Sequence, residues 1–597
     1  MNHRQKVLGA SYSGAVFLLV FLLVSLPFFA GPYFIHMFVL TFFSVGLAIS
    51  YRLVLIAGEV SLAHASFYGI GAYGFSILAI SHGVPFWLAV LLGGLLTGLV
   101  SLAVGFVSLR TTGPYFFLVT FAFGVVITAA IELTPSLTGG FGGVTGIPFP
   151  PFVSDATGFY FVLLTLTVLT FLVFRVLDNS RFGLELRAIG SAPLLAESAG
   201  VNRFQSVLVA FVIGAFFAGI LGSLYASFTG FISPGSFGLN VSIAVLTAVI
   251  IGGVRYMWGG IIGASFILIV PLATSWGGRG QAIFGATSVI IVMMLLRRGI
   301  VTSMSESLVR WTQREPKSAM DTPQATVQLP DSSVQETPRP DLGDVILDVH
   351  DLSKSFGGVH AVKSISFQAR SGETLGVIGP NGSGKTTMFS MISGFLPPDR
   401  GTVTIGGDLV PLRRGPSIVA RRRLVRSFQS SAVFEDLTVF ENVLFAVGGR
   451  RRALGAARFV GSVRSNRRDS HEAMEILREV GLADQSSVGA NHLPYGHKKV
   501  LGLAIALASE PQVLCLDEPA TGMTESEISH LIAVLRRVRS QRGLTLIVIE
   551  HRLSVIRQLC DRVIALRQGE LLAEGSVTEV LETPEVMKTF LGKAQLK

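Results

Sequence analysis

Charged residues and cysteines are both scarce in this chain. Aspartate, glutamate, lysine and arginine make up 14% of its 597 residues, whereas hydrophobic residues make up 50%. This composition excludes an ordinary soluble globular protein and indicates a membrane protein. The two cysteines, Cys515 and Cys560, fall in an apolar run and in a predicted helix. So few cysteines exclude a disulfide-stapled secreted domain and favour buried, reduced thiols in a cytosolic domain.

The low average charge hides a sharp division of the chain. Residues 16–296 form a string of apolar stretches with few charges, while the sequence from Asp344 onward is mixed and charged. A spanning helix needs roughly 20 apolar residues, and the first part holds about ten such stretches. We expect spans at residues 10–30, 33–51, 62–81, 86–107, 114–133, 158–177, 204–229, 241–254, 257–274 and 281–296. The predicted architecture is a polytopic α-helical membrane domain over residues 1–302 and an α/β domain over residues 344–597.

The basic residues indicate how the chain crosses the membrane. The net charge is +10, but the arginines stand at the ends of apolar stretches and in short tracts. This distribution is typical of cytoplasmic loops near anionic headgroups, so we expect no nucleic-acid partner. With a cytoplasmic N-terminus, Arg52, Arg110 and Arg255 fall on predicted cytoplasmic loops, and only Arg279 falls on the other side. An even number of spans then leaves the charged C-terminal part in the cytoplasm.

Glycines recur inside several of the predicted spans. Gly69, Gly71 and Gly74 stand in one span, and a second group at Gly259, Gly260 and Gly263 stands in another. Small residues allow helices to pack closely in a membrane. They are also found where broken helices line a substrate path. The sequence leaves both interpretations open.

Residues 303–343 separate the two parts. The segment lacks apolar periodicity and is dense in proline, serine, threonine, glutamine and aspartate. Such a composition predicts a disordered tether. A flexible coil of about 40 residues has an end-to-end distance of roughly 35 Å. The tether would therefore let the C-terminal domain reach its own membrane domain or a neighbouring one.

A glycine-rich loop opens the chemistry of the C-terminal part. The loop follows a short apolar strand at residues 374–378 and leads into a helix at Met388, which is the setting a P-loop requires. Its residues are Gly379, Pro380, Asn381, Gly382, Ser383, Gly384, Lys385, Thr386 and Thr387. Backbone N–H groups of such a loop curl around nucleotide phosphates at a helix N-terminus. Lys385 would neutralise the β- and γ-phosphates of ATP, and the Thr386 hydroxyl would ligate Mg²⁺.

Two later strands end in groups that complete a phosphate-hydrolysing site. An apolar strand at residues 513–516 ends in Asp517 and Glu518, and another at 545–549 leads to His551. An acidic pair after a strand is usually structural, but the P-loop changes that expectation. Asp517 is predicted to hold Mg²⁺ and Glu518 to act as the general base for water. His551 is predicted to sense the γ-phosphate.

With these motifs in place, residues 346–592 resemble an ABC nucleotide-binding domain. The resemblance implies that Phe356 stacks on adenine and that Gln429 links Mg²⁺ to the permease. The ABC signature, usually Leu-Ser-Gly-Gly-Gln, stands here as Leu493, Pro494, Tyr495, Gly496 and His497. The Tyr-Gly pair and the C-terminal segment resemble ATP-binding proteins of the LivG type, which serve branched-chain amino acid transport. Pro494 and His497 depart from the usual residues, and proline offers the γ-phosphate no donor, so this half-site is expected to be weak.

Residues 40–300 resemble permeases of the LivM type, through motifs at 61–73, 110–116, 138–148 and 181–189. The longest charged stretch between spans, 179–203, resembles an importer coupling loop in which Arg187, Glu197 and Gly200 would press on the ATPase near Gln429. Glu59 and His64 are candidates for the substrate path, since ionisable groups at membrane depth are often functional. Glu59 has an alternative interpretation as a solvated group at the interface.

The resemblance implies an ATP- and Mg²⁺-dependent importer with permease and ATPase fused in one chain. Its expected solutes are branched-chain amino acids or related small neutral or zwitterionic molecules, with urea and amides as the alternative within the family. An exporter and an ATPase with a membrane anchor are the competing classes. The expected setting is a bacterial inner membrane, with an external solute-binding protein. A second permease and a second ATPase subunit, or a second copy of the chain, would complete the assembly.

Overall fold

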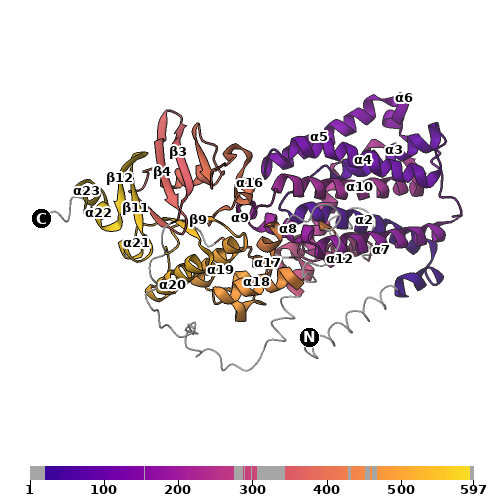
Figure 1. Cartoon of the computed structure of the whole chain (residues 1–597). Helices are drawn as coiled ribbons and strands as arrows, with labels where there is room; N and C mark the ends of the chain where they lie inside the picture. The colour runs from indigo at the N-terminus through magenta and orange to yellow at the C-terminus, as the bar shows by residue number, and fades with distance from the viewer. Residues whose placement is uncertain are drawn as a thin grey trace, which may run out of the picture. The chain divides into compact units, whose positions relative to one another are not determined.

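The computed structural model describes residues 21–153, 155–273, 287, 289–296, 299–304, 343–427, 432–450, 458–459 and 467–591 (Figure 1). The chain divides into two compact units. A helical unit comprises Met1–Asp178 and Val207–Met320, and an α/β unit comprises Asn179–Ser206 and Asp321–Lys597. The second unit therefore includes a segment that lies between two predicted spans.

The described part of the helical unit contains six helical segments that are long and apolar enough to cross a membrane. They are α2 (Pro32–Ile56), α4 (Phe86–Ser108), α5 (Pro114–Leu133), α7 (Ala156–Asn179), α10 (Arg203–Thr229) and Pro234–Gly252, which contains α11 (Leu239–Gly252). Two more apolar helices are α3 (His64–Ser81) and α12 (Met257–Ala273). Helix α3 packs against α4, and α12 packs against α11 and α2. Each predicted span between residues 33 and 274 thus corresponds to a helix. The predicted spans 10–30 and 281–296 lie partly outside the described residues.

Glycine brings these helices into close contact. A Cβ atom on Gly71 of α3 would lie 2.1 Å from the backbone oxygen of Gly219 on α10. A Cβ on Gly259 of α12 would lie 2.0 Å from the backbone oxygen of Gly253. Both α3 and α12 run unbroken through their glycines. The close-packing interpretation is therefore confirmed, and the prediction of broken helices at these positions is wrong.

A buried arginine ties three helix ends together in the helical unit. Arg52 lies in the last turns of α2 rather than on a loop as the span prediction had it, and it is 2% exposed. Its Nε donates to the carbonyl of Val254 at 2.7 Å, and Nη2 donates to that of Arg255 at 2.8 Å. Its Nη1 lies 3.4 Å from Asp178 Oδ1 near the end of α7. A charge can be buried here because these partners satisfy it.

The α/β unit is built on two sheets. The larger has the strand order β12-β11-β5-β10-β9-β8, in which every pair except β11–β12 is parallel. Its strands are β5 (Thr374–Ile378), β8 (Leu424–Arg426), β9 (Val513–Asp517), β10 (Thr545–Ile549), β11 (Arg562–Arg567) and β12 (Glu570–Ser576). The smaller is an antiparallel sheet of β4 (Val359–Arg370), β3 (Val345–Phe356), β6 (Arg400–Ile405) and β7 (Asp408–Leu409), in that order.

One apolar core joins both sheets to the helix that follows the glycine-rich loop. Helix α15 (Lys385–Ile392) contributes Met388, Phe389, Met391 and Ile392 to a buried cluster that also holds side chains of β3, β5, β9 and β10. Burial of this apolar surface holds α15 firmly against the sheets. The loop at its N-terminus is thereby positioned by the core.

Most of the predicted tether, 305–342, lies outside the described residues. The boundaries at 302 and 344 and the disorder of the tether stay predictions. Asn179–Ser206 belongs to the α/β unit, although the predicted boundaries place it within the membrane domain.

Candidate functional site

The glycine-rich loop has a backbone that only glycine adopts readily. Gly379, Gly382 and Gly384 have φ values of 155°, 80° and 98°. A Cβ on Gly379 would lie 2.4 Å from the backbone oxygen of Leu566, and one on Gly384 would lie 2.4 Å from that of Ala361. The glycines are therefore required both by conformation and by close approach of neighbouring backbone. The predicted loop between β5 and α15 is present as expected.

Lys385 is the first residue of α15 and folds back over the loop. Its Nζ donates to the carbonyls of Gly379 at 2.7 Å and Pro380 at 2.9 Å. Burial lowers the pKa of Lys385, and the carboxylates of Glu518 and Asp517 oppose that shift. A cation thus stands next to a helix N-terminus, where backbone N–H groups and the helix dipole also favour an anion. Such an arrangement is suited to polyphosphate.

Strand order brings the loop and the acidic pair to one edge of the sheet. Strand β10 pairs in parallel with β5 on one side and with β9 on the other. The carboxyl ends of β5, β9 and β10 therefore meet at one edge, which carries the P-loop, the Asp517–Glu518 pair and His551. The structure thus brings together groups that are far apart in the sequence.

Asp517 has a cationic partner that the sequence did not reveal. Arg426 Nη2 donates to Asp517 Oδ2 at 2.7 Å, and Arg426 Nη1 donates to Ser390 Oγ of α15 at 2.9 Å. Both side chains are buried. In the sequence, Arg426 is marked only by its position at the end of a short apolar run. Its ion pair with Asp517 forms because β8 lies beside β9. The Thr386 hydroxyl and the Asp517 carboxylate are oxygen donors of the type that Mg²⁺ prefers.

Glu518 is held by contacts at both its backbone and its carboxylate. It adopts the left-handed backbone conformation, with φ 48°, and its N–H donates to the carbonyl of Ile549 at 2.9 Å. Thr521 Oγ1 donates to Glu518 Oε2 at 3.2 Å, and His551 Nδ1 lies 3.9 Å from Glu518 Oε1. A non-glycine residue in this backbone region is uncommon and is found at functional sites.

Two further residues around Glu518 were not predicted. Glu550 is buried and accepts hydrogen bonds from the N–H groups of Ala520 at 3.0 Å and His551 at 3.1 Å, so it fixes the loops on both sides. Lys499 Nζ donates to the Glu518 carbonyl at 3.4 Å. Burial lowers the pKa of Lys499, against the opposing effect of Glu550, Glu518 and Asp517. In the sequence, Lys499 is marked only by its position six residues after Leu493 of the signature.

The signature residues lie at the start of helix α19 (Tyr495–Ala508). Pro494 is the residue before the helix and makes no side-chain capping hydrogen bond, as its lack of a hydroxyl requires. Tyr495 Oη donates to the carbonyl of Thr521 at 3.4 Å, and His497 Nδ1 lies 3.1 Å from Gln485 Oε1. A Cβ on Gly496 would lie 2.0 Å from Glu527 Oε1, so a larger residue here would displace the Glu527 side chain. The roles of Leu493–His497 toward a nucleotide stay predictions.

Two nucleotide-binding predictions depend on residues away from this edge. Phe356 at the end of β3 is 48% exposed, and Lys354 Nζ lies 5.7 Å from its ring centroid. Its exposed face is compatible with the predicted stacking on adenine. Gln429 lies outside the described residues, so its predicted link between Mg²⁺ and the permease stays a prediction.

The predicted coupling residues lie on or just after two short helices of the α/β unit, α8 (Arg181–Ser191) and α9 (Pro193–Ser198). Arg187 lies on α8. Burial raises the pKa of Glu197 on α9, against the opposing effect of Arg203. Gly200 has φ 86°, and its carbonyl accepts a hydrogen bond from Arg421 Nη2 at 3.0 Å. Gly200 thus contacts the ATPase part of the unit, while the coupling roles of Arg187, Glu197 and Gly200 stay predictions.

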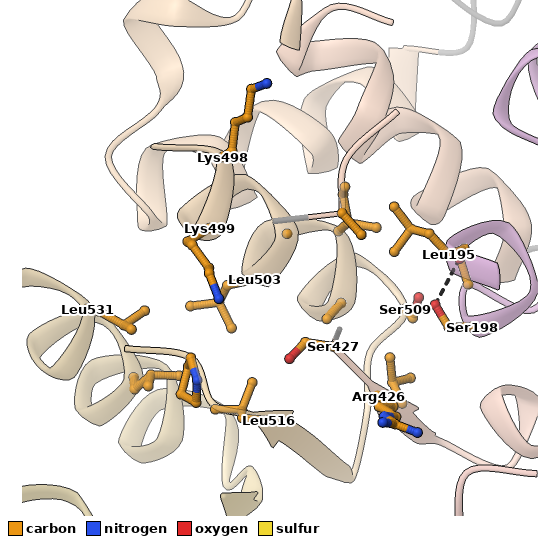
Figure 2. A pocket seen from close by; sticks show the side chains of 18 residues that line it. Leu195, Ser198, Arg426, Ser427, Lys498, Lys499, Leu503, Ser509, Leu516 and Leu531 are labelled. Atoms are coloured by element: carbon orange, nitrogen blue, oxygen red, sulfur yellow. Dashed lines mark hydrogen bonds between the residues drawn. The ribbon is translucent and has the colours of Figure 1, made fainter. Parts of the chain in front are cut away.

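A pocket of about 30 Å³ lies under α9 (Figure 2). Figure 2 shows Leu195 and Ser198 on the side where Arg426 and Ser509 come together, while Lys499 and Leu503 line another part. The pocket therefore borders both the coupling segment and the two buried cations next to Asp517 and Glu518.

The two candidates for a substrate path are buried in the helical unit. Glu59 is 3% exposed, which contradicts the solvated alternative. His64 begins α3, and its Nε2 lies 2.9 Å from Ser50 Oγ, while its ring centroid lies 5.1 Å from that of Tyr51. His64 is thus packed against α2. A role for either residue toward a solute stays a prediction.

Comparisons with known proteins match both units. Residues 33–297 match the family described as the permease component of branched-chain amino acid transport systems, and residues 362–521 match the ABC transporter family. The high-affinity branched-chain amino acid transport ATP-binding protein BraF of Pseudomonas aeruginosa is 34% identical over 255 residues, covering 42% of this chain and 98% of BraF. LivG of Salmonella typhimurium has the same identity and coverage. A solved ATP-binding cassette of an ABC transporter in its ADP conformation is 26% identical, with a TM-score of 0.37, covering 42% of this chain and 100% of that one.

Proposed function

The chain belongs to the family of branched-chain amino acid ABC transporters, and from this premise we propose that it couples ATP hydrolysis to solute import across a bacterial plasma membrane. Its proposed solutes are branched-chain amino acids or related small neutral or zwitterionic molecules. The observation that carries the proposal is the joining, in one chain, of a permease match over residues 33–297 to an edge holding Lys385, Asp517 and Glu518. The N-terminus and the α/β unit would both be cytoplasmic.

The residues of the loop bind the phosphates of ATP in this proposal. Backbone N–H groups from Asn381 to Thr387 surround the β- and γ-phosphates at the N-terminus of α15. The Lys385 ammonium leaves the carbonyls of Gly379 and Pro380 and contacts phosphate oxygens instead. Phe356 stacks on the adenine ring. Binding ATP thus exchanges hydrogen bonds from the ammonium to neutral carbonyls for ion pairs with phosphate oxygens.

Oxygen donors at the same edge would hold Mg²⁺. Thr386, Asp517 and Gln429 are its proposed ligands, directly or through water. When bound, Mg²⁺ neutralises charge on the phosphate oxygens. Arg426 orients the Asp517 carboxylate by its 2.7 Å contact. The oxygen donors Thr386 and Asp517 support this proposal, since Mg²⁺ prefers such ligands.

Hydrolysis rests on Glu518 and His551. Glu518 accepts a proton from a water molecule whose oxygen attacks the γ-phosphorus, while the bond from that phosphorus to the ADP oxygen breaks. Thr521 and the Ile549 carbonyl orient Glu518 for this step. His551, 3.9 Å from the carboxylate, donates to the γ-phosphate. The products are ADP and inorganic phosphate.

The assembly is proposed to contain two ATPase units arranged head to tail. Each nucleotide would lie between the loop of one unit and the Leu493–His497 signature of the other. Because Pro494 offers no donor, the site completed by this signature is expected to be the weaker of the two. A separate permease and ATPase, or a second copy of the chain, would supply the other half, and an external binding protein would deliver the solute.

Nucleotide-driven closure would move the segment that holds Arg187, Glu197 and Gly200. Its contacts with the α/β unit make it the proposed coupling element between ATP and the permease. Import is favoured over export because this segment consists of short helices of 11 and 6 residues, rather than long cytoplasmic extensions of the spans. An importer of urea or amides remains the alternative within the family.

The test is solute uptake into proteoliposomes that contain the full chain, its partner subunits and its external binding protein. We expect ATP-dependent uptake of radiolabelled leucine but not of radiolabelled urea. Glu518→Gln should reduce phosphate release by the chain about 100-fold or more without abolishing nucleotide binding. Glu525→Gln, at an 87% exposed side chain on α20 (Glu525–Arg542), is the matched control. Uptake of urea alone would replace the proposed substrate class, and unchanged hydrolysis by Glu518→Gln would remove its catalytic role.

A further inference from the structure

Helix α8 carries two charges of opposite sign that are each paired across the coupling contact. Arg181 forms an ion pair with Asp469, the third residue of α18 (Arg467–Glu479). Glu185, four residues later, forms an ion pair with Arg458. Residues four apart lie on one face of a helix, so both pairs form on the same side of α8.

The order of the charges is the informative feature. Along α8 the order is positive then negative, and the α/β unit presents Asp469 and Arg458 in the complementary order. A shift of α8 by one helical turn in either direction would bring like charges together, either Arg181 against Arg458 or Glu185 against Asp469. Like-charge contacts suppress wrong partners and wrong registers. If α8 carried two charges of the same sign, a shift by one turn would still bring opposite charges together and would not be excluded.

The surroundings of Arg458 strengthen this discrimination. Its guanidinium lies 5.4 Å from the ring centroid of Phe182 and 5.9 Å from that of Phe459, and the two rings are 5.1 Å apart. Arg458 Nη2 also donates to Ser206 Oγ at 2.6 Å, and Ser206 donates to Glu185 at 3.1 Å. The Arg458 and Glu185 side chains are only 23% and 18% exposed. Charges in so dry a site are expensive to leave without an opposite charge.

Two further polar contacts of the segment, both between described residues, carry little sequence information. Arg421 donates to the backbone carbonyl of Gly200, and the backbone N–H of Glu435 donates to Ser191 Oγ at 3.1 Å. Since each involves a backbone group on one side, neither depends on the full pair of side chains. Among these contacts of the described residues, the two ion pairs are the ones that depend on a charged side chain on both sides.

We propose that the pairs Arg181–Asp469 and Glu185–Arg458 form a charge code that selects which ATPase domain docks on the coupling segment and sets its register. The occupant is an ATPase domain with an acid at the Asp469 position and a cation at the Arg458 position, which is the domain of this chain type. This inference rests on the proposed function, because it takes Asn179–Ser206 as the coupling segment of the permease.

The experiment uses the full chain with a protease site inserted between residues 305 and 342. After cleavage in detergent, the permease half retains Asn179–Ser206, so the ATPase half remains with it only through non-covalent contacts. We expect the two wild-type halves to co-elute in size-exclusion chromatography. Glu185→Arg and Arg458→Glu should each weaken the association of the halves about tenfold or more. The double variant Glu185→Arg/Arg458→Glu should restore it substantially.

A second pair and a control protect the interpretation. Arg181→Asp and Asp469→Arg should repeat the pattern of loss in the single variants and recovery in the double variant. Glu475→Arg, on the same helix α18 but with a side chain that is 59% exposed, should leave co-elution unchanged. Phosphate release by each uncleaved variant reports whether its ATPase is folded.

The outcomes separate this inference from the proposed function. Separation of the wild-type halves, undiminished association in the single reversals, or double reversals as weak as the singles would each overturn the charge code. An uncleaved wild-type chain that releases no phosphate would instead count against the proposed ATPase activity, while the co-elution result would still decide the charge code.

Discussion

The guanidinium of Arg426 lies 2.7 Å from the carboxylate of Asp517, and the two side chains are only 8% and 2% exposed. The contact joins the ends of the neighbouring parallel strands β8 and β9. It places a permanent cation next to the predicted Mg²⁺ ligand. The same guanidinium lines the pocket under α9, so one residue borders both the catalytic edge and the coupling segment.

Replacing Arg426 by glutamine should destabilise the α/β unit. The change removes the cation that faces a buried carboxylate, and breaking a buried ion pair costs about 3–5 kcal/mol of unfolding free energy. Denaturant unfolding followed by far-UV circular dichroism would measure the decrease in unfolding free energy. Arg422→Gln is the control, because the Arg422–Asp408 pair is 51% and 79% exposed and should be worth less than about 1 kcal/mol. Equal effects of the two substitutions would contradict the prediction.

Thr521 is expected to act on catalysis by orienting Glu518. Valine keeps the shape of the side chain but loses the hydroxyl that donates to Glu518 Oε2 at 3.2 Å. A hydrogen bond to a charged group is worth about 1.5–3 kcal/mol, so Thr521→Val should lower kcat about tenfold or more. The KM for ATP should stay unchanged, because Thr521 has no predicted phosphate contact. Steady-state phosphate release measures both constants, and Thr521→Ser should restore kcat if orientation is the cause.

Lys499 should make stability depend on alkaline pH. Burial lowers its pKa below the ordinary value of 10.5, so the folded protein releases this proton at a lower pH than the unfolded chain does. Below both pKa values the buried ammonium costs stability in full, and between them the unfolded chain binds more protons, so this contribution to stability rises with pH.

The substitution Lys499→Met removes that cost at nearly constant side-chain length. We expect the variant to melt at a higher temperature than wild type at pH 7, with a difference that shrinks as the pH approaches 10. Thermal melts across this range, read by circular dichroism, give the comparison. If the melting temperature of Lys499→Met relative to wild type instead rises with pH, the ammonium stabilises the fold through its 3.4 Å contact with Glu518.

Helix packing in the helical unit should be sensitive to single methyl groups. Gly71→Ala would place a Cβ 2.1 Å from the Gly219 carbonyl, and backbone on both sides leaves no flexible group to yield. Overpacking of this kind costs about 1–3 kcal/mol or more. Gly98→Ala, inside α4, is the control, since its nearest neighbour would be the Phe216 side chain at 3.8 Å. Melting in detergent should separate the two variants, and similar melting temperatures would show that α3 and α10 can move apart freely.

The sequence predicted those parts of the site that are encoded in short consecutive motifs. Gly379–Thr387, Asp517–Glu518 and His551 each follow a recognisable apolar strand, and strand order then brings them to one edge. Arg426, Lys499 and Thr521 were missed because each acts through a partner set by tertiary packing. Nothing in the local sequence around Arg426 shows that β8 will lie next to β9.

The same limit explains the glycines and the coupling segment. Glycine serves both close packing and helix breaks, so the choice for Gly71 depended on seeing Gly219 opposite it. The charge pattern of α8 was visible in the sequence. Its complement was not, since Arg181 and Asp469 are 288 residues apart.

That separation has a consequence for how the protein is made. A ribosome adding about 5–20 residues per second needs roughly 15–60 s to travel from Arg181 to Asp469. During this interval α8 has been synthesised, whereas the surface that buries Phe182 against Phe459 has not. The nascent permease therefore carries an amphipathic helix whose Phe182 side is uncovered until an ATPase domain emerges, and fusion supplies one such domain for every permease.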